Sequence, residues 1–307
     1  MPTPHAPTRA VLILVTVVLF LIWSNSFVAM SYLLGTERQA ARLDWVTLTT
    51  ARFAPVTVLS AVYLALFRRK AAIAVLRRHF GRCLASGLLG VTAYSLCLYW
   101  GIQHGIPAPI ASLLTALSPL YLLGLGAIFL GERLTFRKAL GFLIAFFGLA
   151  AVALSHGGLR FAALVPVVVA ACAPLVWAIQ TTLSKPVSRE VPADVWTAAY
   201  LVLGGLPMLA ALPWAGGAEL LALDGTGWLA VAFLSLACTV LGFGLWSWLL
   251  VHLPASTLGF TVFLNPPLAL LSQAVLATFF PATFVFVLSV PEVVGCGVVL
   301  AGMAIAL

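Results

Sequence analysis

The stretch Gly141-Phe-Leu-Ile-Ala-Phe-Phe-Gly148 returns 154 residues later as Gly295-Cys-Gly-Val-Val-Leu-Ala-Gly302. Both versions lack charged residues and carry a glycine at each end. Further matches keep the same order along the chain: Trp23 with Trp177 at an offset of 154, Asp44 with Asp194 at 150, and Thr92 with Thr239 and Pro119 with Pro266 at 147. Similarity at a nearly fixed offset indicates an internal repeat. The sequence therefore predicts two related halves, residues 1–154 and 155–307.

The composition around these stretches is that of a membrane protein. Hydrophobic residues make up 63% of the 307 residues and charged residues 8%, whereas soluble proteins have roughly 45–50% and about 25%. A bilayer-crossing helix needs about 20 apolar residues, and ten stretches qualify: 10–34, 45–67, 80–102, 108–130, 137–154, 161–183, 193–213, 226–249, 255–279 and 287–307. Helices are expected because lipid leaves unpaired backbone groups without partners, and the alternation of barrel strands is absent. The predicted fold is an all-α polytopic membrane protein forming one membrane domain, which excludes a large aqueous catalytic domain.

The basic residues predict the orientation of the chain. Twelve lie on one side of the predicted spans (Arg9, Arg68, Arg69, Lys70, Arg77, Arg78, Arg82, Arg133, Arg137, Lys138, Lys185, Arg189) and three on the other (Arg38, Arg42, Arg160). The positive-inside rule then places both termini in the cytoplasm. Each half has five spans, an odd number, so the second half is expected to enter the membrane inverted. The net charge of +8 is interpreted as loop charge, and no nucleic-acid partner is expected.

Inverted repeats are typical of secondary transporters, whose substrate site lies near the midplane between the repeats. The stretches Ser112-Leu-Leu-Thr-Ala-Leu-Ser-Pro119 and Phe129-Leu-Gly-Glu-Arg-Leu-Thr-Phe-Arg-Lys-Ala-Leu-Gly141 resemble the signature of the EamA-type drug/metabolite transporters. The stretch Ile22-Trp-Ser-Asn-Ser-Phe27 and the pair Arg52-Phe53 are similar to other motifs of that family. The resemblance covers the whole chain.

This resemblance implies ten helices in two inverted five-helix repeats. It implies that helices one, three, four, six, eight and nine surround a central cavity and that helices five and ten are peripheral. It further implies export of small metabolites, most often amino acids, across a bacterial cytoplasmic membrane. The second half departs from the pattern, since Gly131-Glu132 stands opposite Thr278-Phe279 and a seven-residue insertion with Pro281 and Pro291 precedes the last span. A symmetric role for Glu132 is therefore not expected.

Polar and aromatic side chains near span centres are candidates for the substrate site, because they are costly in lipid unless they face a cavity or a partner. The candidates are Trp23, Asn25, Ser26, Tyr94, Tyr99, Trp177, Gln180, Trp246 and Asn265. Hydrogen bonding between helices is the alternative for the serine and the amides, and packing is the alternative for the aromatic residues. Pro119 and Pro266 predict helix kinks that border the cavity.

Arg52 is the only lysine or arginine well inside a predicted span. It could bind a substrate carboxylate, pair with Asp44 or extend toward the interface, and a structural role is favoured. No aspartate or glutamate lies near a span centre, so no proton relay is evident. The five cysteines form no Cys-x-x-Cys pair, and neither Gly-x4-Gly-Lys-Ser/Thr nor His-Glu-x-x-His occurs. No metal, cofactor or enzymatic activity is therefore expected.

The sequence thus favours a secondary transporter that exports amino acids or similar zwitterionic or amphiphilic compounds by alternating access. Its predicted partners are a small-molecule substrate and the lipid bilayer, and no oligomeric state is indicated. A sugar-phosphate or nucleotide-sugar carrier is one alternative, but several cavity lysines or arginines would be expected there. A non-transporting, flippase-like membrane protein is the other, and a bundle without a central cavity would favour it.

Overall fold

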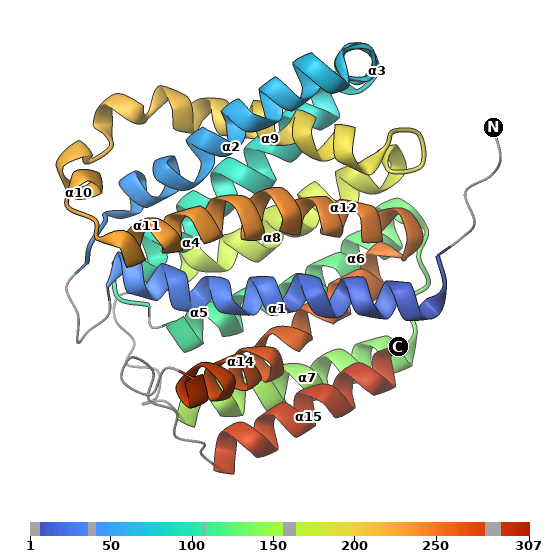
Figure 1. The fold of residues 1–307 in the computed structure, drawn as a ribbon. Coiled ribbons are helices and arrows are strands. Elements are labelled where there is room, and N and C mark those ends of the chain that lie inside the picture. Colours follow the sequence, from blue (N-terminus) through green and yellow to red (C-terminus); the bar gives the residue numbers. More distant parts are fainter. Residues whose placement is uncertain (1–6, 36–40, 107, 156–163, 280–289) are drawn as a thin grey trace.

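The computed structural model of the chain describes residues 7–35, 41–106, 108–155, 164–279 and 290–307, and every regular element in these ranges is helical (Figure 1). The first half contains α1 (Arg9–Leu34), α2 (Trp45–Phe67), α3 (Arg69–Gly87), the π-helix η1 (Leu88–Ala93), α4 (Tyr94–Gln103), α5 (Ala108–Thr115), α6 (Ser118–Leu130) and α7 (Phe136–Ser155). The second half contains α8 (Leu164–Val187), α9 (Ala193–Ala210), η2 (Leu212–Trp214), α10 (Gly217–Leu221), α11 (Gly225–Ala232), the π-helix η3 (Phe233–Leu241), α12 (Gly242–His252), α13 (Ala255–Phe260), the 3-10 helix η4 (Thr261–Leu264), α14 (Asn265–Phe279) and α15 (Val290–Ala306).

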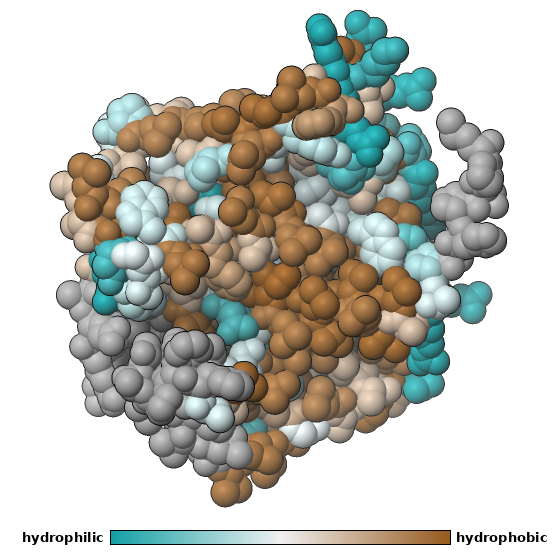
Figure 2. Space-filling model, in the orientation of Figure 1, coloured by the Kyte–Doolittle hydropathy of each residue, from teal (hydrophilic) through white to brown (hydrophobic). Residues whose placement is uncertain are grey.

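Eight helical stretches within these ranges are long and apolar enough to cross a membrane: Arg9–Leu34, Trp45–Phe67, Arg69–Gln103, Leu113–Leu130, Leu164–Val187, Ala193–Ala210, Gly225–His252 and Ala255–Ser272. Val290–Ala306 is a shorter apolar helix. Figure 2 shows apolar side chains over most of one face, with hydrophilic side chains near α3 and along that edge of the molecule. The described part of the chain is therefore all-helical and has the build of a multi-pass membrane protein. The predicted starts of the sixth and tenth spans, together with Arg38, Arg160 and Pro281, lie outside the described residues.

The third helix begins earlier than the sequence analysis predicted. The basic segment before residue 80 was expected to be a loop, but it is helical from Arg69. The backbone of α3 is non-helical at His79 (φ −128°, ψ 20°), next to the predicted start of the span, and the helix then continues through η1 and α4 to Gln103. The expectation was wrong because Ala72, Val75 and Cys83 are buried at helical spacing while the arginines between them remain exposed. An amphipathic helix of this kind has too little total hydrophobicity to be recognised as part of a span.

Repeat-related helices lie against each other on both flanks of the molecule. Figure 1 shows α2 beside α9 on one flank and α7 beside α15 on the other, with α1, α6, α8 and α12 between them. A Cβ atom added to Gly141 would lie 2.5 Å from the carbonyl oxygen of Gly302, and one added to Gly148 would lie 2.9 Å from that of Gly295. In the repeat, Gly141 corresponds to Gly295 and Gly148 to Gly302. Because Gly141 contacts Gly302 and Gly148 contacts Gly295, the two helices are antiparallel. Small residues allow this close approach of backbones.

Candidate functional site

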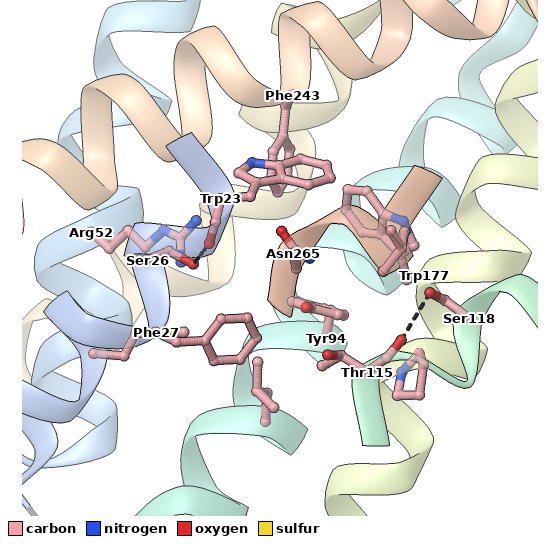
Figure 3. A pocket seen from close by; sticks show the side chains of 14 residues that line it. Trp23, Ser26, Phe27, Arg52, Tyr94, Thr115, Ser118, Trp177, Phe243 and Asn265 are labelled. Atoms are coloured by element: carbon pink, nitrogen blue, oxygen red, sulfur yellow. Dashed lines mark hydrogen bonds between the residues drawn. The ribbon is translucent and has the colours of Figure 1, made fainter. Parts of the chain in front are cut away.

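A cavity lies between the two halves, beside the middle portions of their helices (Figure 3). Its lining comes from α1 (Trp23, Ser26, Phe27, Met30), α2 (Arg52), α4 (Tyr94, Leu98), α5 and α6 (Thr115, Ser118), α8 (Pro174, Trp177), α12 (Phe243), and η4 and α14 (Val262, Asn265). The six helices that the resemblance assigned to a cavity all contribute to it, and α2 joins them. Of the lining residues described, none comes from α7 or α15, which were expected to be peripheral.

An aromatic cluster forms one wall of the cavity. The ring centroids of Trp23 and Trp177, the matched tryptophans of the two halves, are 5.7 Å apart. The Trp177 ring also lies 5.5 Å from that of Tyr94 and 5.2 Å from that of Phe243. Trp246 completes the cluster, 5.4 Å from Trp23, but it is 1% exposed and does not line the cavity. The Trp23–Trp177 and Trp177–Phe243 pairs are edge-to-face, an arrangement that adds to the stability of aromatic contacts, so this wall of the cavity is aromatic and well packed.

Two π-helical segments position parts of this wall. Thr92 lies in η1 and its sequence match Thr239 lies in η3, so both halves widen the helix at corresponding places. Tyr94 follows η1 directly, and Phe243 comes two residues after η3. The indole nitrogen of Trp23 donates a hydrogen bond of 3.0 Å to the carbonyl oxygen of Cys238 in η3. Such π-helical turns are often found at functional sites.

Arg52 supplies the only charge among the lining residues. It is 7% exposed, its Nε donates to Thr239 Oγ1 at 2.8 Å, and its Nη1 donates to the hydroxyl of Tyr99. The predicted alternatives of a pair with Asp44 or an extension toward the interface are wrong. The carboxylate of Asp44 instead accepts hydrogen bonds from the backbone of Val46 and Thr47 at the start of α2. Burial without a counter-ion is costly for a guanidinium, and no described carboxylate pairs with Arg52, so its charge is not balanced by this part of the chain.

The fourth and ninth spans are both broken at the cavity, next to the two prolines predicted to cause kinks. Pro119 lies in the first turn of α6, after a break that separates it from α5, and Ser118 donates to the carbonyl oxygen of Thr115 across this break at 2.9 Å (Figure 3). Pro266 lies in the first turn of α14, after η4. Asn265, directly before it, lines the cavity, and its Oδ1 is buried without a hydrogen-bond partner among the described residues. The breaks therefore bring polar groups to the cavity.

The predicted site residues do not all line the cavity. The cavity is lined by Trp23, Ser26, Arg52, Tyr94, Trp177 and Asn265, whereas Tyr99 and Trp246 lie behind this lining and support it. Asn25 instead joins α1 to α14, since its amide donates to Leu21 O at 2.8 Å and to Ser272 Oγ at 3.0 Å. Gln180 is buried and donates to Ser184 Oγ at 3.0 Å.

Sequence reasoning missed several lining residues, notably Phe27, Thr115, Ser118 and Phe243. Ser118 directly precedes the predicted kink, and Phe243 lies one helical turn before the candidate Trp246. Their positions in the sequence could therefore have indicated both as lining residues. Phe27 and Thr115 had none beyond their span.

Three charged side chains form hydrogen bonds with groups at the ends of α12 and α13. Glu132, just after α6, accepts hydrogen bonds through Oε1 from Ala255 N at 2.6 Å and through Oε2 from Ser256 N at 2.9 Å and from the Ser256 hydroxyl. Lys138 Nζ donates to Ser256 Oγ at 2.8 Å. Lys185 Nζ donates to the carbonyl oxygens of Leu250 and Leu253 at 2.5 and 2.6 Å. We call this set of contacts the end lock. It ties α6 of the first half to the α12–α13 junction of the second, on the side predicted to be cytoplasmic.

Comparisons with known proteins give the context of this site. The sequence model described as the EamA-like transporter family matches residues 10–154 and again residues 164–307. The chain is 31% identical over 189 residues to a "Probable terminal-alkyne amino-acid exporter" of Streptantibioticus cattleyicolor, covering 60% of this chain and 61% of that protein. It is 26% identical over 190 residues to a "Probable amino-acid metabolite efflux pump" of Salmonella typhimurium, covering 58% and 62%.

An "Uncharacterized transporter" of Archaeoglobus fulgidus is 30% identical over 192 residues, covering 62% of this chain and 63% of that protein. The chain therefore spans about three fifths of the length of these curated relatives. A solved crystal structure matches over 97% of both chains with a TM-score of 0.73 and 23% identity, which shows a shared fold.

Proposed function

Because the chain belongs to the EamA-like transporter family, we propose that it exports amino acids or closely related small metabolites across a bacterial cytoplasmic membrane. The observation that carries this proposal is the cavity shared by both halves, with an aromatic wall and one buried guanidinium. Small-molecule sites combine mostly apolar walls with a few placed polar groups. The names of two relatives, an amino-acid exporter and an amino-acid metabolite efflux pump, support the same substrate class.

Transport proceeds by alternating access between two inverted five-span repeats. The antiparallel contacts of α7 with α15 and of α2 with α9 support an inverted relation between the halves. So do the two consecutive family matches. The arginines of α3 lie on a helix, but they still precede the apolar part of the third span. The positive-inside argument for ten spans and cytoplasmic termini therefore applies to them as before.

The conformation corresponds to a state closed toward the cytoplasm. The lining residues of α1 run from Trp23 to Met30, toward the helix end that is predicted to be external. Trp23 and the aromatic cluster mark the other end of this lining, and the end lock lies among residues predicted to be on the cytoplasmic side. Substrate entry from the cytoplasm requires both to separate.

A sugar-phosphate carrier fits the cavity poorly, since Arg52 is the single basic residue among the described lining. The test is counterflow in proteoliposomes with a panel of labelled amino acids, with and without an imposed pH gradient. Saturable exchange of at least one amino acid is expected. Protein-free liposomes and liposomes loaded with a sugar phosphate serve as controls. Exchange of the sugar phosphate without any amino-acid exchange would overturn the proposal.

A further inference from the structure

The cavity contains two polar side chains, Arg52 and Asn265, that keep hydrogen-bonding capacity without a partner in the described part of the chain. We propose that together they select a substrate with one carboxylate and one primary ammonium group on an apolar body, such as an apolar α-amino acid. Arg52 binds the carboxylate, and Asn265 accepts hydrogen bonds from the ammonium group. This inference rests on the proposed function and specifies the substrate class of the same site.

The guanidinium of Arg52 is prepared for an anion. It has five N–H donors, and its described partners, Thr239 and Tyr99, account for two of them. Both partners are neutral, and among the described residues no carboxylate lies within 4.0 Å of it. The two contacts hold the guanidinium in place, and its other three donors have no partner among the residues that the structure describes. A substrate carboxylate fits these donors in a bidentate arrangement and supplies the missing charge.

Asn265 offers the complementary group on another helix of the same cavity (Figure 3). Its Oδ1 is a buried acceptor with no donor among the described residues, and an unused buried acceptor is costly. An ammonium group carries three donors and no acceptor, so it satisfies this oxygen. The rings of Trp23 and Trp177 line the same space, and aromatic faces also attract a cation.

The rest of the lining determines the body of the substrate. Tyr94, Trp177 and Phe243 present rings, and Leu98 and Val262 add aliphatic surface. A second charge on the substrate would face none of opposite sign among these described residues. The cavity therefore favours apolar or aromatic side chains over acidic or basic ones.

The first experiment uses the unmodified protein, purified in detergent, and three probes: L-phenylalanine, phenethylamine and 3-phenylpropanoate. The second probe lacks the carboxylate and the third lacks the amine. Phenylalanine is expected to bind at least about tenfold more tightly than either, because each missing group leaves a buried polar partner unsatisfied. Equal binding of phenethylamine would overturn the role of Arg52. Equal binding of 3-phenylpropanoate would overturn the role of Asn265.

Variants assign each group to its residue. Arg52→Gln should weaken phenylalanine binding at least about tenfold and leave phenethylamine binding unchanged, and Asn265→Ala should spare 3-phenylpropanoate. Arg69→Gln removes the same charge from an exposed position of α3 and should leave the binding of all three probes unchanged. If Arg52→Gln fails to fold, Arg52→Lys and the probe series on the unmodified protein still test whether Arg52 binds the carboxylate. If the protein exchanges amino acids but binds the three probes equally well, only this inference is refuted. If it exchanges no amino acid, the proposed function is refuted.

Discussion

Replacing Glu132 by alanine should open the side of the cavity that the end lock closes. The Glu132 carboxylate accepts two backbone hydrogen bonds and one hydroxyl hydrogen bond at the start of α13. It comes from the first half and its partners come from the second. These contacts must break when the two halves separate at this end. The substitution therefore destabilises the closed state and leaves the open state, in which water hydrates the same groups, nearly unchanged.

The size of the effect follows from these contacts. A hydrogen bond to a charged group contributes about 1.5–3 kcal/mol, and loss of a capping side chain at a helix start costs about 0.5–2 kcal/mol. The three bonds share one carboxylate and are not additive. A net loss of about 2–3 kcal/mol is therefore expected, and this changes the ratio of closed to open states roughly 30- to 160-fold.

Thiol labelling measures this ratio. Ser118→Cys places a thiol in the cavity lining, in a background from which the five native cysteines have been removed. A membrane-impermeant maleimide applied to inside-out vesicles then reports access from the cytoplasmic side. Glu132→Ala should increase the labelling rate at least about tenfold. Arg133→Ala, at the exposed neighbouring position, should not. An unchanged rate in Glu132→Ala would refute the assignment of the end lock to cytoplasmic closure.

Two further predictions concern packing and orientation. Gly141→Ala should lower the thermal unfolding temperature in detergent, because its Cβ would lie 2.5 Å from the Gly302 carbonyl oxygen and overpacking costs typically about 1–3 kcal/mol. Gly297→Ala, whose Cβ would meet nothing within 4 Å, is the matched control, and equal unfolding temperatures for the two variants would contradict the packing argument. Alkaline phosphatase fused after His104 should be active and fused after Arg78 inactive, and the reverse pattern would overturn the orientation.

The helices and the repeat could be predicted because they depend on local composition. Long apolar runs leave the backbone no alternative to helix in lipid, and the glycine pairs in residues 141–148 and 295–302 are visible without knowing their contacts. The basic start of α3 was missed because hydropathy averages over both faces of an amphipathic helix. Its buried stripe at Ala72, Val75 and Cys83 becomes informative only when helical spacing is considered.

The cavity residues could be predicted only in part, for a geometric reason. Adjacent residues on a helix point about 100° apart, so the neighbours Asn25 and Ser26 have different surroundings, and the sequence alone does not say which of them reaches the cavity. The first helix is apolar on all sides, and its sequence does not indicate which face turns inward. The structure turns Ser26 to the cavity and Asn25 to Ser272. The partners of Arg52 were likewise inaccessible, since Thr239 lies 187 residues away in the chain.

The matched aspartates of the two halves indicate which parts of the molecule stay together during transport. Asp194, at the start of α9, accepts from Tyr63 at 2.6 Å and from Arg68 at 2.9 Å, both near the end of α2. At the opposite end of the same pair, the backbone N–H of Asp44 donates to Glu219 at 3.0 Å. The end of α2 is thus tied to the start of α9, the start of α2 is tied to α10, which follows α9, and the α7–α15 pair is held by glycine contacts along its length. The helices between these two pairs contain the helix breaks and the π-helical turns, and the end lock joins them at one end. A change between closed and open states therefore breaks the fewest contacts among these central helices.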